Sequence, residues 1–439
     1  MKPTLLKSLL GATIFFAPPG VAPVAAMAAT SPEIASRPTD IAPADAVTAS
    51  VDAYYAAHGN APIWLKQGPA SPGAMALMQT LRRAPLDGLL SGPRMADEIQ
   101  AALATTGDRD GAAGADRLMS IAWLRYVTAL HAPAPGMMYV ETRLAPRVPA
   151  AGYVLEQAAR AVSLPDLVAA VASVSPMYAP LRDAAWSQAQ ASGSSLPDPR
   201  IMANLDRVRA LPATGRFILV NAATQQLSMV ENGRVVDTMK VVVGRADAQT
   251  PMIASTIWYA TFNPYWNVPS DLGRKLIAPH VIKDGVSWLS KNGYEVISDW
   301  DKPTVLPSTS VNWKGVIAGT TEVKMRELPG AANSMGVVKF GFGNPQGIYL
   351  HDTNNRVLFK NARRTLSNGC VRLEDAKRLG RWMGGDMIAP NASPEQNVRL
   401  PQGTPVYITY ITATAQNGQI AFSSDVYSRD TGADRLASR

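Results

Sequence analysis

Residues 348–373, IYLHDTNNRVLFKNARRTLSNGCVRL, contain the only cysteine of the 439-residue chain, Cys370, and one of its four histidines, His351. A lone cysteine forms no internal disulfide, and a free thiol in an oxidising compartment calls for an explanation. The functional explanation is a thiol nucleophile whose proton is taken by His351. The structural alternative is a small buried hydrophobic residue, which is what most free cysteines are.

The residues around Cys370 favour the functional explanation. Gly369 permits unusual backbone dihedral angles and close approach of a substrate. The backbone N–H groups of Cys370 and its neighbours are natural donors to an oxyanion. Residues 371–379, VRLEDAKRL, are predicted to begin a helix, whose dipole would stabilise a thiolate together with Arg372. His351 ends a predicted strand, which would hold its imidazole in place.

The N-terminus has the pattern of a cleavable signal peptide over residues 1–28. Lys2 and Lys7 precede an apolar core from Leu9 to Ala17, and small residues follow. A membrane anchor needs roughly 20 unbroken apolar residues, and Pro18-Pro19-Gly20 interrupts this run too early. We therefore expect an exported protein.

Charge and composition indicate which classes of function and how many structural units to expect. The formal net charge is +8, and Lys and Arg are scattered without a block of five or more. This pattern argues against nucleic-acid binding. A chain of this length that is 47% hydrophobic can bury sizeable cores in two or three structural units.

Helical residue patterns in the first half of the chain give way to strand-like patterns in the second half. The predicted fold class is therefore α+β. Two hairpin signals, Asn232-Gly233 and Asn417-Gly418, mark the β region; the second is expected to join a strand at 406–412 with one at 419–422. Residues 269–322 interrupt the strands and read as a lid, or alternatively as a decorative subdomain. The predicted divisions are a flexible linker at 29–50, a helical domain at 51–200, a mainly β catalytic domain at 201–428 that carries the insert, and a tail at 429–439.

The string from His351 to Cys370 resembles the signature of the YkuD-type L,D-transpeptidases. That signature is a His, a gap of about this length, then Ser/Thr-His-Gly-Cys and an apolar residue; here Asn368 replaces the second His. The replacement points to the YcbB-like branch of Gram-negative enzymes. Further strings resemble the same branch, namely 242–252, 263–269, 333–340 and 349–353. Many proteins of that branch carry a peptidoglycan-binding domain between the scaffold and catalytic domains. Because only residues 186–198 stand in that place here, we expect a shorter form without that domain.

The resemblance implies a helical scaffold domain, a YkuD catalytic domain and a two-step reaction. Cys370 would attack the carbonyl of the third residue of a peptidoglycan tetrapeptide stem, and His351 would take its proton and later protonate the leaving D-alanine. The resulting thioester would react with the diaminopimelate amine of a second stem to give a 3→3 cross-link. No metal or organic cofactor enters this scheme.

Further residues receive roles from the same resemblance. Ser367, Asn368 and Gly369 would shape the oxyanion loop. The backbone carbonyl of Asp352 would orient His351, with the Asp352 carboxylate as the competing candidate. Three side chains keep two open interpretations. Arg372 would contact a stem carboxylate or form an ion pair with Glu374 or Asp375, and Tyr349 and Trp266 would be pocket walls or core aromatics.

Three functions stay open at this stage. The first is the 3→3 transpeptidase, acting in the periplasm on stem peptides beside wall-synthesis partners, in an oligomeric state that the sequence leaves open. The second sends the same acyl-enzyme to water, to a free D-amino acid or to a lysine of a lipoprotein. The third is a non-catalytic wall-binding protein, against which the presence of both Cys370 and His351 argues.

Overall fold

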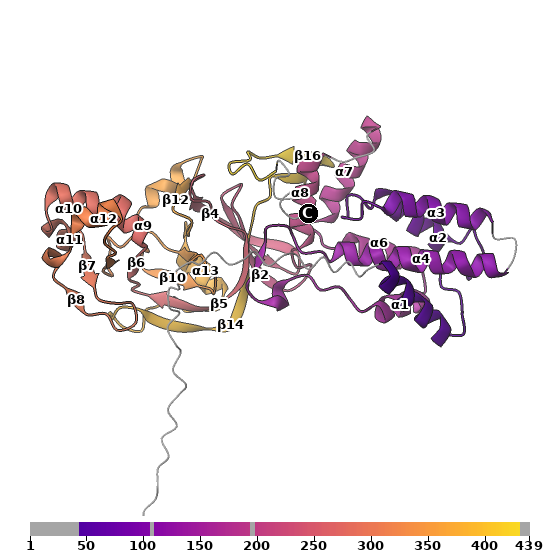
Figure 1. The fold of residues 1–439 in the computed structure, drawn as a ribbon, viewed down its shortest axis with the longest axis horizontal. Coiled ribbons are helices and arrows are strands. Elements are labelled where there is room, and N and C mark those ends of the chain that lie inside the picture. Colours follow the sequence, from indigo (N-terminus) through magenta and orange to yellow (C-terminus); the bar gives the residue numbers. More distant parts are fainter. Residues whose placement is uncertain (1–43, 106–108, 194–197, 431–439) are drawn as a thin grey trace, which may run out of the picture.

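A computed structural model describes residues 44–105, 109–193 and 198–430. Figure 1 shows an elongated molecule with a helical bundle at one end, a β domain in the middle and a small mixed subdomain at the other end. The predicted α+β class, helical domain first and mainly β domain second, is confirmed. The predicted signal peptide and the first part of the linker lie outside the described residues. Within the described ranges, no helix is long and apolar enough to cross a membrane.

Six helices form the N-terminal bundle. Val47, Val51 and Tyr55 recur at helical spacing and are buried in its core, so residues 44–50 form part of the first helix and the predicted linker is wrong there. The buried carboxylate of Asp116 fixes the segment after this helix by accepting hydrogen bonds from the N–H groups of residues 63–65 at 2.7–2.8 Å. The bundle comprises α1 (Ala44–Ala57), α2 (Pro72–Arg83), α3 (Gly92–Ala104), α4 (Arg109–Leu130), α5 (Ala151–Arg160) and α6 (Leu164–Ser173).

Two further helices, α7 (Ala179–Ser192) and α8 (Pro199–Arg209), lie against the β domain. Leu181 of α7 and Leu205 of α8 share a core with Phe217 and Tyr407 of the β domain. Only residues 193–198 separate these two helices, which is too short a segment for a separate domain between them. The packing of α7 and α8 therefore gives no boundary between the helical domain and the β domain at residue 200.

Eight strands of the β domain close into a barrel. Their order is β5-β10-β11-β13-β4-β3-β2-β14, and β14 returns to pair with β5. Short strands β1 (Met138–Tyr139) and β12 (Thr365–Ser367) attach to β5 and β4. The barrel strands are β2 (Arg216–Asn221), β3 (Gln226–Glu231), β4 (Arg234–Gly244), β5 (Ile253–Phe262), β10 (Val338–Gly341), β11 (Tyr349–His351), β13 (Val371–Leu373) and β14 (Gln396–Thr409).

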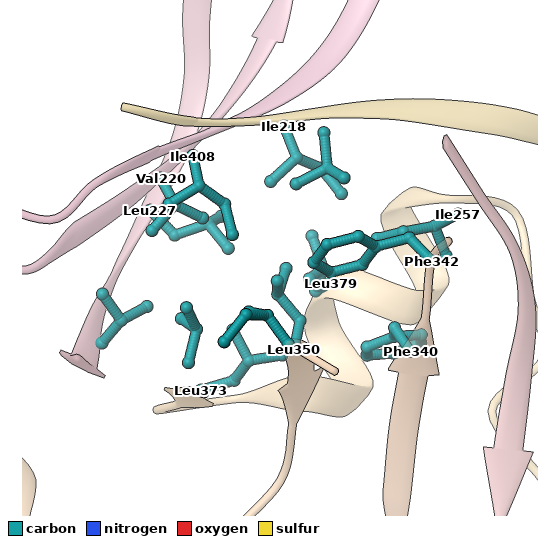
Figure 2. Close-up of a cluster of buried hydrophobic side chains, with 14 of the residues drawn as sticks. Ile218, Val220, Leu227, Ile257, Phe340, Phe342, Leu350, Leu373, Leu379 and Ile408 are labelled. Atoms are coloured by element: carbon teal, nitrogen blue, oxygen red, sulfur yellow. The ribbon is translucent and has the colours of Figure 1, made fainter. Parts of the chain in front are cut away.

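One apolar cluster fills the barrel. Figure 2 shows Phe340 of β10, Leu350 of β11 and Leu373 of β13 within it, facing Ile218 and Ile408 from the opposite wall. Because side chains alternate along a strand, the residues between these core positions point out of the barrel. The alternation therefore defines an outer face on β10, β11 and β13.

The two hairpin predictions have different outcomes. The Asn232-Gly233 turn joins β3 and β4 with positive φ at both residues, as a type I′ turn requires, so this prediction is confirmed. The Asn417-Gly418 turn joins β15 (Ala413–Gln416) and β16 (Gln419–Phe422) in a separate sheet, so the predicted pairing with 406–412 is wrong. β14 pairs with β2 on one side and β5 on the other. It therefore offers no free edge to a further strand.

The insert is a subdomain with its own core. A four-stranded sheet in the order β6-β9-β7-β8 packs against short helices through Val268, Ile277, Trp313 and Met325. The predicted helix at 271–282 is present as three consecutive helical pieces, whereas the sheet was not predicted. Its elements are β6 (Trp266–Val268), α9 (Ser270–Leu272), a π-helical turn (Gly273–Ile277), α10 (Ala278–Asp284), α11 (Ser287–Lys291), β7 (Tyr294–Ile297), β8 (Val305–Leu306), α12 (Trp313–Ala318) and β9 (Lys324–Glu327).

The first residues of the predicted tail belong to the fold. Asp430 is buried and forms ion pairs with Arg207 at 2.8 Å and Arg200 at 3.1 Å, both on α8. The tail prediction is therefore wrong for residues 429–430, and residues 431–439 lie outside the described part of the chain.

Candidate active site

Cys370 and His351 come from neighbouring parallel strands of the barrel. The register pairs Leu350 with Val371 and His351 with Arg372, so Cys370, directly before β13, stands beside Tyr349. Leu350 and Val371 point into the barrel core. Cys370 and His351 therefore share the outer face of the barrel wall, two register positions apart.

The predicted helix directly after Cys370 is wrong. Residues 371–373 form β13, which lies between β11 and β4 and bonds to both. The helix α13 (Ala376–Trp382) begins later, where the Asp375 side chain accepts the Arg378 N–H at 2.9 Å. Because two neighbouring strands hold the backbone after Cys370 extended, the thiol lies at no helix N-terminus. A helix dipole therefore contributes nothing to a thiolate here.

The backbone carbonyl of Asp352 orients His351. It lies 2.6 Å from the imidazole Nδ1, and since a carbonyl can only accept, Nδ1 carries the proton of the neutral ring. The Asp352 carboxylate is used elsewhere: it accepts the Val337 N–H at 3.0 Å and pairs with Arg356. Nε2 is thereby left as the basic nitrogen of His351.

Burial keeps both members of the pair neutral. Burial, together with the nearby Arg372 and Lys339 cations, lowers the pKa of His351 to about 3, against the opposing effect of the Asp352 and Met335 backbones. Burial also raises the pKa of the Cys370 thiol, although a hydrogen bond from the Tyr349 backbone and the charge of Arg372 oppose that rise. The resting pair is therefore a thiol beside a neutral imidazole, and not a preformed ion pair.

The loop before Cys370 is held by its own hydrogen bonds. Ser367 Oγ donates to the Cys370 carbonyl at 2.6 Å and accepts the Gly369 N–H at 3.1 Å. Gly369 has φ of 118°, which favours glycine. The Asn368 side-chain oxygen accepts a hydrogen bond from Arg245. With the Gly369 N–H already paired, the Cys370 N–H is the candidate oxyanion donor of this loop.

The structure brings two of the remaining predicted residues to the pair and leaves one away from it. Arg372 is half-buried beside His351, and the described residues include no ion pair between it and Glu374 or Asp375. Tyr349 lies beside Cys370, and burial raises the pKa of its hydroxyl. Trp266, by contrast, packs on the core of the insert, with its ring 6.5 Å from that of Tyr294.

Three residues near the site received no role from the sequence. Lys339 pairs with His351 across the strands and forms an ion pair with Glu395 at 3.0 Å. Thr250 Oγ1 donates to the Gly369 carbonyl at 2.7 Å and so supports the loop. Lys339 and Thr250 both stand in strings that resemble the family, and this resemblance could have indicated them. Glu395 lies more than 50 residues after Lys339 in the sequence, outside those strings, so nothing in the sequence indicated it. In the described chain, no group of three or more His, Cys, Asp or Glu residues could hold a metal ion.

Replacing Gly336 with alanine should impair the site more than the fold. Gly336 has φ of 66°, and an added Cβ would lie 2.5–2.6 Å from the Asp352 side chain. Asp352 must then move, and with it the carbonyl that holds His351. We expect a loss of about 1–3 kcal/mol in unfolding free energy and a fall in turnover at saturating substrate of at least about tenfold. Urea unfolding and steady-state kinetics measure the two effects.

Gly293 provides the matched control for this substitution. It also has a positive φ, 74°, but an added Cβ would meet nothing within 4 Å. Gly293→Ala should therefore lose about 1 kcal/mol of unfolding free energy through backbone strain alone and keep its turnover. Equal turnover in the two variants would show that Gly336 does not act through Asp352.

Two family matches agree with this geometry. Residues 215–408 match the L,D-transpeptidase catalytic domain called YkuD, and residues 49–184 match a scaffold domain. The chain therefore contains a YkuD-type L,D-transpeptidase catalytic domain preceded by a scaffold domain.

Individual relatives carry the same name. A curated protein of Haemophilus influenzae named "Putative L,D-transpeptidase" is 27% identical over 241 residues, which cover 53% of this chain and 48% of the relative. The chain thus spans about half the length of that relative. Among solved structures, an L,D-transpeptidase from Mycobacterium smegmatis (12% identity, TM-score 0.23, 45% of this chain and 60% of that chain) and L,D-transpeptidase 1 of Mycobacterium tuberculosis (10%, 0.20, 45% and 64%) are similar in part. The assignment depends on the two domain matches alone.

Proposed function

We propose that this protein is a periplasmic L,D-transpeptidase that forms 3→3 peptidoglycan cross-links through a thioester on Cys370. The observation that carries the proposal is the pairing of Cys370 with a neutral His351 on adjacent strands, within a matched L,D-transpeptidase catalytic domain. A nucleophile, a base and a fixed tautomer are the parts that acyl transfer by a cysteine requires.

The first half-reaction releases D-alanine. His351 Nε2 takes the thiol proton while Cys370 Sγ attacks the carbonyl carbon of the third stem residue. The Cys370 N–H stabilises the oxyanion that forms. The C–N bond to D-alanine then breaks, His351 returns the proton to the leaving amine, and the stem remains bound to Cys370 as a thioester.

The second half-reaction resolves the thioester. The diaminopimelate amine of another stem attacks the thioester carbonyl and transfers its proton to His351. The C–S bond breaks, an amide bond forms, and the thiol regains its proton. Because the resting thiol and imidazole are both neutral, the first proton transfer accompanies the attack. Arg372, half-buried beside the pair, is suited to bind a stem carboxylate.

The acceptor is the finer part of the proposal, and product analysis tests it. Purified protein incubated with tetrapeptide stems should release D-alanine and form 3→3 dimers, measured by liquid chromatography and mass spectrometry. Tripeptides without dimers would identify water as the acceptor. Exchange of the fourth residue would identify a free D-amino acid, and stems on a lysine of an added lipoprotein would identify attachment. Absence of any D-alanine release would favour a wall-binding protein.

A further inference from the structure

A buried carboxylate, that of Glu327, lies where the insert returns to the barrel. Glu327 is the last residue of β9, and residues 328–337 connect this strand to β10 (Figure 1). Glu327 is 6% exposed, and no Lys, Arg or His of the described chain forms an ion pair with it. Burial raises the pKa of its carboxyl group. Because a buried carboxylate without a cation costs folding free energy, the packing of the insert core does not explain its presence.

The Glu327 carboxylate holds the connection that follows β9. Its Oε2 accepts the Ser334 N–H at 2.9 Å, and the Ser334 hydroxyl also donates to the carboxylate. The neighbouring Asn333 is 1% exposed and donates to the Glu327 and Leu328 backbone carbonyls at 3.3 and 2.9 Å. Residues 333–334 are therefore fixed to the end of β9.

The next two residues of this connection contact His351 and Asp352. The Met335 backbone hydrogen-bonds to the His351 ring. Gly336 lies so close to the Asp352 side chain that a Cβ at this position would have no room. The backbone carbonyl of Asp352 lies 2.6 Å from the His351 Nδ1, as described above. The connection therefore leads, contact by contact, from the Glu327 carboxylate to the imidazole.

Glu295 provides a comparison within the same sheet. It lies on β7 and forms an ion pair with Arg326, its cross-strand partner on β9, at 2.6 Å. Because side chains alternate along a strand, this pair lies on the opposite face of the sheet from Glu327. Within the described residues, its hydrogen bond goes to Arg326 and none joins it to residues 328–337. Glu295 therefore stabilises the sheet without acting on the connection.

We propose that Glu327 is a positioning residue for His351. Its carboxylate fixes Ser334, and the two residues that follow Ser334 then hold the imidazole in the orientation that proton transfer requires. The insert thereby supports the histidine of the barrel as well as its own core. This role rests on the proposed function, in which His351 is the base.

Kinetics of three variants test the role in turnover. Glu327→Leu removes the acceptor while it keeps a similar volume, and Glu327→Gln keeps an acceptor oxygen. The leucine variant should lose at least about tenfold in turnover at saturating stem concentration, with KM changed less than about twofold. Glu327→Gln should stay within about threefold of wild type. Glu295→Leu is the matched control and should keep its turnover.

The imidazole nitrogen signals of His351 in nuclear magnetic resonance separate loss of position from failure of the proposed reaction. The chain has four histidines, and His351→Asn identifies the signals of this one. In wild type at neutral pH they should be those of a neutral ring with its proton on Nδ1. Glu327→Leu should shift them toward the Nε2-protonated form, whereas Glu327→Gln and Glu295→Leu should not. This readout needs no turnover, so it tests the position of His351 even if wild type does not act on stems.

Thermal unfolding checks that each variant folds. If Glu327→Leu does not fold, Ser334→Ala decides, because it removes one donor to the carboxylate and should shift the same signals in the same direction. Unchanged His351 signals in the variant that decides, or an equal shift in Glu295→Leu, would overturn the proposal. Wild-type turnover in a folded Glu327→Leu would overturn it as well.

Discussion

Replacing Cys370 with serine should abolish stem turnover, with a fall in rate of at least about four orders of magnitude. Cys370 is the only cysteine of the chain, so no neighbouring thiol can take over. The reason lies in the environment of the side chain. His351 is a weak base here, because burial lowers its pKa to about 3, and a serine hydroxyl is far harder to deprotonate than a thiol. D-alanine release from tetrapeptide stems measures the effect.

The fold should tolerate this substitution, which separates loss of chemistry from loss of structure. Cys370 is half-buried, and its thiol donates a weak hydrogen bond to the Gly347 carbonyl at 3.7 Å and accepts one from the Tyr349 backbone. We expect the unfolding free energy to change by less than about 1 kcal/mol. A folded serine variant that turns over stems near the wild-type rate would contradict the assignment of the nucleophile.

Replacing His351 with asparagine should lower turnover by about two to four orders of magnitude. In the proposed mechanism the neutral imidazole takes the thiol proton and returns it to the leaving amine, and asparagine can do neither. His280→Asn is the matched control, because this exposed histidine stacks on Trp288 in the insert, with ring centroids 4.7 Å apart. It should keep wild-type turnover, and a comparable loss in both variants would show that His351 is not the base.

The same pair of variants should differ in acid stability. In the unfolded chain His351 regains a pKa of about 6.5, whereas in the fold its pKa is about 3. Between these values the unfolded state binds one proton more, so the histidine lowers stability as pH falls from about 6.5 to 3, by up to about 1.4 kcal/mol per pH unit. The stability of His351→Asn should therefore fall less steeply than that of wild type in this window.

Urea unfolding at several pH values between 7 and 4 measures this difference. Above pH 7 the asparagine variant should differ from wild type by a constant amount, because neither chain changes protonation at residue 351. His280→Asn should follow the wild-type slope. Parallel curves for wild type and His351→Asn throughout the window would contradict a histidine that the fold keeps neutral.

Local patterns were sufficient to predict much of the fold and the pair of residues, Cys370 and His351, that the barrel brings to one face. The Asn232-Gly233 turn could be predicted because Asn and Gly tolerate positive φ, and this preference depends on the two residues themselves. The string from His351 to Cys370 also named the pair that the barrel brings together. The turn depends on the conformational preferences of two neighbouring residues, and the pair is part of a motif that can be read in the sequence.

Long-range pairing accounts for the errors. Residues 371–373 have a helix-like pattern with the residues that follow, yet β11 and β4 on either side hold them as a strand. The strand at 419–422 pairs with 413–416 because β14 is already bonded on both edges. Val47 belongs to a helix because α1 is buried against the bundle. No local pattern reports these partners.

The residues that tune the site depend on the same long-range contacts. Lys339 and Arg372 lie on strands that flank His351, and their charges help to lower its pKa. The sequence suggested a thiolate stabilised by a helix dipole. The fold instead places a buried, neutral imidazole beside a half-buried, neutral thiol. That difference changes the expected proton transfer from a preformed ion pair to one that accompanies attack.

The intact mass of the protein during turnover tests the central claim most directly. Wild-type protein mixed with tetrapeptide stems and quenched early should gain the mass of a stem less D-alanine, and peptide mapping should place that mass on Cys370. Cys370→Ala should show no such species. A stem attached to any other residue, or the same added mass on Cys370→Ala, would contradict a thioester at Cys370.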